Sequence, residues 1–201
     1  MSTTAEELYD GGVQAAVDGG VFVDHVGGVV VPWNDYSDVG MFMEAHARGS
    51  FTASIAAKPR LPLLAFHDNR RFPLGHAVDW SDEPTGLRAR FKLNVTPDAQ
   101  MLGQLMLSGE PMGLSVGFVP ERSEWRYAAD WNPDLGPDHM DRLVRLRSRW
   151  VEVSITPTPA FAAAMIDTID AEATSERACP KRDAARVWLE RHRQAGGRLV
   201  A

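Results

Sequence analysis

The chain has 201 residues, of which 44% are hydrophobic and 24% are charged, with a formal net charge of -6. This composition suits one domain with a core of ordinary size, and the negative charge argues against a nucleic-acid-binding surface. The single cysteine, Cys179, has no partner for a disulfide or a thiolate metal site and fits a reducing compartment. An acidic N-terminus without signal-peptide features, and no apolar run of about 20 residues, predict a soluble intracellular protein.

The first half of the chain predicts mainly strands. Residues 1–20 contain two Gly-Gly pairs and only weak helical spacing, which favours a flexible leader. VFVDHVGGVVVPWN, residues 21–34, is rich in β-branched residues and indicates a strand with a bulge, or a hairpin. EAHARGSF, residues 44–51, predicts a short helix that ends at Gly49. PLLAFHD (62–68) is a short apolar run that ends in polar residues.

The strongest local signals are one strand and one helix. In GLRARFKLN, residues 86–94, apolar and basic side chains alternate, which predicts a half-buried strand. A helix is predicted over 97–108, because Thr96 can cap it, Pro97 suits its first position and Gly109 can close it. Its apolar stripe is formed by Leu102, Leu105 and Met106.

The second half resumes the strand pattern around a long irregular segment. MGLSVGFV (112–119) and LVRLRSRWVEVSIT (143–156) read as strands, and residues 121–141 between them are typical of a lid or a disordered insert. We expect an α+β fold: a flexible leader (1–20), a mostly antiparallel sheet with one or two packed helices (21–168), and a polar, basic C-terminal tail with one helix (169–201).

Ser115 lies in an unusual strand. Alternation places Gly113, Ser115 and Gly117 on one face, and glycines that flank a serine often mark the close approach of another segment, for which a substrate strand is one candidate. The same pattern also fits a serine that is merely small enough to pack under another element.

His67 and Glu152 could complete a catalytic group. A serine needs a base to become a nucleophile, and histidine is the usual one; alternation places His67 on the face of Leu63 and Ala65, where it could equally be a hydrogen-bonded structural residue. Glu152 lies between β-branched residues and should meet a histidine or an arginine, or be exposed. Asp68 is the competing partner for His67. The other histidines show no zinc-binding spacing, so we expect neither a metal nor a cofactor.

In chain order, these segments resemble the caudovirus prohead serine protease family over roughly residues 22–165. The motifs that carry the resemblance are VVVPWND, EAHARGSF, LLAFHDNRRFPLGHAVDW, GLRARFKL, SGEPMGLSVGF and WVEVSITPTPAF. The family is similar in fold to the herpesvirus assembly protease, which implies a barrel-like sheet. The resemblance implies that His67 is the catalytic base, that Ser115 is the nucleophile and that Glu152 is the third member.

The resemblance also implies a function and its partners. The protein would be a serine endopeptidase in the procapsid, inside the host cytoplasm, that cleaves scaffolding protein or the scaffold-like arm of the capsid protein and then itself. Self-association in the procapsid is expected, and membrane or nucleic-acid partners are not. Two alternatives stay open: an inactive assembly or scaffolding protein with the same fold, and a β-rich binding domain in which the three residues are coincidental.

Overall fold

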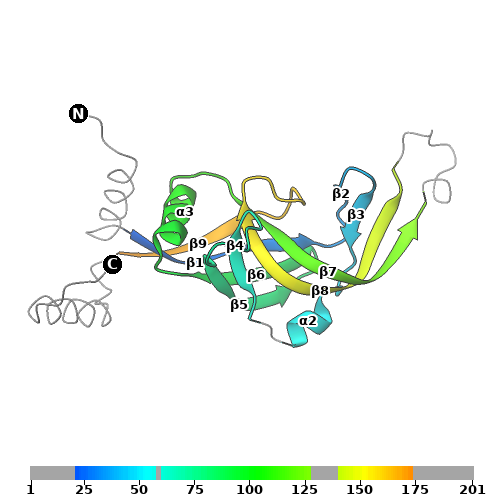
Figure 1. Cartoon of the computed structure of the whole chain (residues 1–201), viewed down its shortest axis with the longest axis horizontal. Helices are drawn as coiled ribbons and strands as arrows, with labels where there is room; N and C mark the ends of the chain where they lie inside the picture. Colours follow the sequence, from blue (N-terminus) through cyan, green and yellow to red (C-terminus); the bar gives the residue numbers. More distant parts are fainter. Residues whose placement is uncertain (1–20, 58–59, 128–139, 174–201) are drawn as a thin grey trace, which may run out of the picture.

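The structure, a computed structural model, describes residues 21–57, 60–127 and 140–173. These residues form a nine-stranded mixed sheet and two short helices (Figure 1). The elements are β1 (Val21–Pro32), β2 (Ser37–Asp38), β3 (Met43–His46), α2 (Thr52–Ala56), β4 (Pro62–Ala65), β5 (Gly75–Asp82), β6 (Gly86–Leu93), α3 (Pro97–Leu107), β7 (Gly113–Arg126), β8 (Arg142–Thr156) and β9 (Ile166–Ala173). No helix among the described residues is long and apolar enough to cross a membrane.

The sheet is organised around β8. The strand order in the sheet is β2-β3-β8-β4-β5-β6-β1-β9, and β7, which is not part of this order, also pairs with β8. β8 runs parallel to β3 and to β4, whereas the other neighbouring strands are antiparallel. The α+β class and the mostly antiparallel sheet are therefore confirmed.

The expected barrel-like closure is wrong. A barrel needs hydrogen bonds between its first and last strands, but among the described residues β2 forms a strand pair only with β3, and β9 only with β1. The sheet is open, with the long strands β7 and β8 crossing the body and continuing past it beside β2 and β3 (Figure 1).

Residues of β1, β4, β6, β7, β8 and α3 contribute to the core. Alternate residues of β6 are buried, as its pattern predicts. The Gln100 side chain of α3 accepts a hydrogen bond from the Val23 backbone N–H and donates one to the Val23 carbonyl, both at 3.0 Å. α3 begins at Pro97 as predicted and ends at Leu107, one residue earlier than predicted; Gly109 follows at φ 95°, and Thr96 makes no side-chain capping bond. Leu105 is exposed, contrary to its assignment to the apolar stripe.

Three local predictions need correction. Residues 44–51, predicted as a short helix, are not helical: residues 44–46 belong to β3, because pairing with β8 satisfies their backbone groups, and turns follow. Residues 121–126, predicted as part of a lid or insert, continue β7, again because they pair with β8. β9 was not predicted, because its polar sequence gives no strand signal and it forms a strand through pairing with β1, which is distant in the sequence. The leader (1–20) and residues 174–201 of the tail lie outside the described residues.

Candidate active site

Ser115 and Glu152 lie on the same face of the β7–β8 pair. Ser115 is opposite Ser154, and Gly117 is opposite Glu152. Because residues that face each other in an antiparallel pair point to the same side, the four positions share one face. The geometry of this single strand pair therefore sets the spacing between the serine hydroxyl and the carboxylate.

His67 reaches the same face from a different strand. β4 is parallel to β8, with Leu64 beside Ser154 and Ala65 beside Ile155. β4 ends at Ala65, and the next two residues, Phe66 and His67, have φ values of 53° and 57°. This left-handed turn directs the imidazole toward β7 and β8. The predicted placement of His67 on the face of Leu63 and Ala65 is wrong, because the turn interrupts the alternation of the strand.

The three side chains form a continuous hydrogen-bonded chain. His67 Nε2 lies 3.0 Å from Ser115 Oγ, and His67 Nδ1 lies 2.6 Å from Glu152 Oε1. The carboxylate accepts the Nδ1–H, which leaves Nε2 free to accept the serine proton. Ser115 is buried, and the Glu152 side chain is 11% exposed, whereas the His67 side chain is 46% exposed. A reactant can therefore approach the imidazole while the carboxylate stays shielded from water.

Gly117 provides the space that Glu152 occupies. A Cβ at position 117 would lie only 2.0 Å from Glu152 Oε1, so the carboxylate lies directly over the glycine. A register shift between Gly117 and Phe118 leaves Val151 as an extra residue in β8, and the Trp150 indole N–H donates to the Glu152 carbonyl at 3.0 Å. Bulges of this kind often redirect a side chain next to an active site.

Ser154 contacts two parts of this group. Its hydroxyl donates to Glu152 Oε2 at 2.7 Å and accepts the backbone N–H of His67 at 2.9 Å. Sequence reasoning gave Ser154 no role, although alternation along the strand places it on the face of Glu152. The missing signal was the β4–β8 pairing, which brings the His67 backbone to Ser154.

Asp68, the alternative partner for His67, is occupied elsewhere. Its carboxylate accepts hydrogen bonds from the Arg70 backbone N–H at 3.1 Å and from the Arg70 guanidinium Nε at 2.9 Å. These bonds lower the pKa of Asp68 below its ordinary value. The structure brings Glu152, not Asp68, to the imidazole.

A groove of about 550 Å³ adjoins His67 and Glu152. Its apolar lining comes from β4, the loop after it, β7 and β8, and comprises Pro62, Leu64, Pro73, Phe118, Val119 and Val151. Val119 and Val151 are exposed. Asn69 and Arg71 also line the groove, so an apolar surface with a polar and charged contribution lies next to the hydroxyl–imidazole–carboxylate chain.

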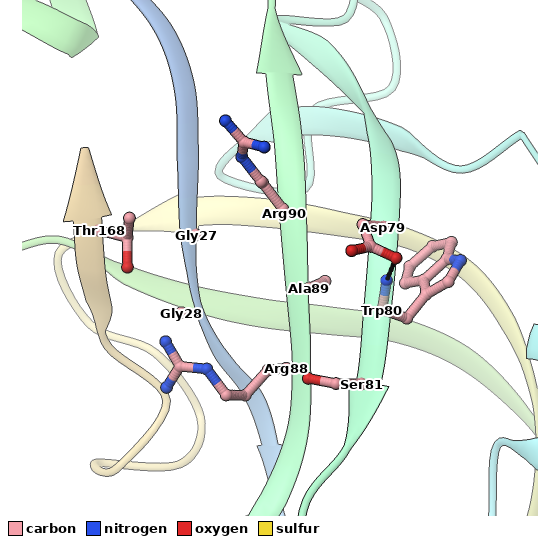
Figure 2. Close-up of a pocket in the computed structure, with 9 residues that line it drawn as sticks. All are labelled: Gly27, Gly28, Asp79, Trp80, Ser81, Arg88, Ala89, Arg90 and Thr168. Carbon is pink, nitrogen blue, oxygen red and sulfur yellow. Dashed lines mark hydrogen bonds between the residues drawn. The ribbon is translucent and has the colours of Figure 1, made fainter. Parts of the chain in front are cut away.

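A second, smaller pocket of about 190 Å³ lies over β1, β5 and β6 (Figure 2). Arg88 and Arg90 line it, but each pairs with a carboxylate of β9: Arg88 with Asp167, and Arg90 with Asp170. The hydrogen bonds between Arg88 and Asp167 raise the pKa of the arginine and lower that of the aspartate. This pocket shares no lining residue with the groove, and its arginine charges are already balanced.

A hydroxyl, an imidazole and a buried carboxylate joined in this order form the arrangement that serine hydrolases use, on many unrelated folds. The family model described as caudovirus prohead serine protease matches residues 16–178. The chain therefore belongs to the caudovirus prohead serine protease family. No curated protein matches the chain.

Proposed function

We propose that the protein is an active serine endopeptidase in which Ser115 is the nucleophile, His67 the general base and Glu152 the residue that orients the imidazole. The observation that carries this proposal is the hydrogen-bonded chain from Ser115 through His67 to Glu152, with distances of 3.0 and 2.6 Å. Both contacts lie within the range that proton transfer requires.

The geometry supports an acyl-transfer mechanism. His67 Nε2 takes the proton of Ser115 as Oγ attacks the peptide carbonyl, and Glu152 stabilises the imidazolium that forms. The imidazolium then gives its proton to the leaving amine as the peptide C–N bond breaks, which leaves an acyl group on Ser115. A water molecule, deprotonated by His67, hydrolyses this ester and restores the serine hydroxyl.

The groove and the adjacent strand edge support a peptide as substrate. Among the described residues, the edge of β7 that faces away from β8 is paired only at its start, where Gly113 bridges Met165 and the Leu114 N–H donates to the Ala164 carbonyl. Beyond Leu114, this edge offers backbone groups beside Ser115, which an extended peptide can pair with. The apolar groove beside His67 then takes a substrate side chain.

Family membership supports the biological role. In this proposal the protein acts inside the procapsid in the host cytoplasm, self-associates there, and cleaves scaffolding protein or the scaffold-like arm of the capsid protein, and then itself. Scaffold and capsid precursors are peptide substrates present in the same particle, so no further recognition partner is needed.

The test is co-expression of the chain with its proposed substrates, the capsid and scaffolding proteins of the same phage. We expect processing by the wild type and no processing by Ser115→Ala or His67→Ala. Glu152→Gln should lower the rate by about 10⁴-fold, whereas Asp68→Asn, a matched change on the neighbouring carboxylate, should leave it near that of the wild type.

Two outcomes decide against the proposal. Equal processing by the wild type and by Ser115→Ala would assign cleavage to another enzyme. No processing by the wild type, together with normal particle assembly, would favour an inactive assembly protein. Self-cleavage is followed separately by the mass of the stored protein, since trimming should occur in the wild type and be absent in Ser115→Ala.

A further inference from the structure

Ser154 lies at the junction of the three elements that build the candidate site. Ser154 is 0% exposed, and its hydroxyl both donates and accepts a hydrogen bond. It donates to Glu152 Oε2 at 2.7 Å and accepts the His67 backbone N–H at 2.9 Å. One side chain thus holds the carboxylate and the backbone that carries the imidazole.

The contact to Glu152 leaves the carboxylate one orientation. Oε1 faces the imidazole at 2.6 Å, and Oε2 faces the Ser154 hydroxyl at 2.7 Å. Rotation about the last side-chain bond of Glu152 would break both contacts at once. A buried carboxylate that loses a donor also loses part of what compensates its desolvation.

The contact to His67 holds a turn that the backbone does not favour. Phe66 and His67 both have positive φ values, 53° and 57°, and a side chain larger than glycine in this region costs about 1–2 kcal/mol per residue. The turn is attached to β8 by the Phe66 N–H, which donates to the Ile155 carbonyl at 3.1 Å, and by the bond from His67 to Ser154. Without the serine, one of these two attachments is lost.

We propose that Ser154 is a positioning residue for the proteolytic reaction: it holds the Glu152 carboxylate and the His67 backbone in register, so that the imidazole stays between Glu152 and Ser115. The inference rests on the proposed function. A displacement of about 1 Å at a reacting group can lower a rate by roughly 100-fold, so we expect Ser154→Ala to lower kcat by about 10- to 100-fold with little change in KM.

β8 contains a matched control. Ser148 is 1% exposed, and its hydroxyl makes no hydrogen bond among the described residues. Ser148→Ala therefore removes a buried hydroxyl from the same strand without removing a contact. It should keep the kcat of the wild type, which separates the contacts of Ser154 from the general effect of a buried serine-to-alanine change.

The experiment uses a peptide that spans a site cleaved only when Ser115 is present. kcat and KM are measured for the wild type, Ser154→Ala and Ser148→Ala, together with the low-field proton NMR signal of the His67 Nδ1–H. We expect the signal to shift or broaden in Ser154→Ala alone, because it reports the bond to Glu152. If Ser154→Ala does not fold, Ser154→Cys decides, since sulfur keeps the shape but bonds weakly, and a lowered kcat is expected.

Wild-type kcat and an unchanged NMR signal in the folded Ser154 variant would overturn the inference while leaving the protease assignment intact. Cleavage that persists in Ser115→Ala would instead overturn the protease assignment. The two failures are therefore distinguishable.

Discussion

Substitution of Gly117 by alanine tests the geometry of the site most directly. The added Cβ would lie 2.0 Å from Glu152 Oε1, 2.8 Å from its Cδ and 2.9 Å from its Cγ. Oε1 would have to move by about 1 Å or more to reach a van der Waals distance. Since Oε1 is also the atom that lies 2.6 Å from His67 Nδ1, the clash can be relieved only by disturbing that bond.

The expected effect is large on activity and moderate on stability. A misplaced reacting group lowers a rate by roughly 100-fold, and loss of a triad carboxylate lowers it by about 10⁴-fold. We therefore expect Gly117→Ala to lower kcat/KM by a factor between these two values. All of the clashing atoms belong to one flexible side chain, so the fold can adapt. We expect the free energy of unfolding to fall by about 1–3 kcal/mol, the cost of disturbed buried hydrogen bonds.

A double-mutant cycle separates this mechanism from others. When Glu152 is already alanine, the methyl group at position 117 has no carboxylate to displace, so Gly117→Ala should have no further effect on kcat/KM. Peptide cleavage gives kcat/KM, and urea unfolding gives stability. Wild-type activity in Gly117→Ala, or a double variant far less active than Glu152→Ala, would refute the reasoning.

Two further predictions concern stability. His46 is fully buried among aromatic rings, with both ring nitrogens unpaired among the described residues; burial, and then the charge of Arg145, lowers its pKa from 6.5 to about 3. Below pH 6.5 this histidine binds a proton in the unfolded chain, whereas in the folded chain it does so only near pH 3. As the pH is lowered between these two values, the free energy of unfolding should therefore decrease by about 1.4 kcal/mol per pH unit. Urea unfolding at pH 7 and pH 5 should show that the free energy of unfolding decreases less in His46→Phe than in the wild type. An equal decrease in both proteins would contradict the role given to His46. Phe66 is 59% exposed and has a φ of 53°, a conformation that asparagine adopts more readily. Phe66→Asn should therefore raise the free energy of unfolding by up to about 1 kcal/mol. A decrease would show that the contacts of the Phe66 ring stabilise the fold by more than the backbone strain costs.

The elements that sequence could predict are those with strong local signals. β6 alternates between apolar and basic residues, and α3 has proline at its start and glycine after its end, so local pattern and final structure agree. The residues of the candidate site could be singled out because the motifs that contain His67, Ser115 and Glu152 resemble those of the caudovirus prohead serine protease family, whereas local alternation alone left each of them a structural alternative.

What sequence could not predict depends on pairing between distant segments. Residues 43–46 have no intrinsic preference strong enough to resist pairing with β8, and they become β3. The left-handed turn at Phe66 and His67 had no sequence signal, since neither residue is the glycine or asparagine that such a conformation favours. The role of Ser154 depends on this turn and on the parallel β4–β8 register, so it was hidden for the same reason.

The two halves of the site are held with unequal strength. Ser115 and Glu152 project from one antiparallel strand pair, whose hydrogen bonds fix their separation over many residues. His67 depends on a short turn that is attached to β8 through the Phe66 N–H and through Ser154. A perturbation of this turn can therefore move the imidazole without unfolding the sheet. It follows that loss of the Ser154 hydroxyl, which loosens this turn, should impair the proposed chemistry at a smaller loss of stability than changes that disrupt the backbone pairing of β7 with β8, because only the turn can shift while the rest of the core stays packed.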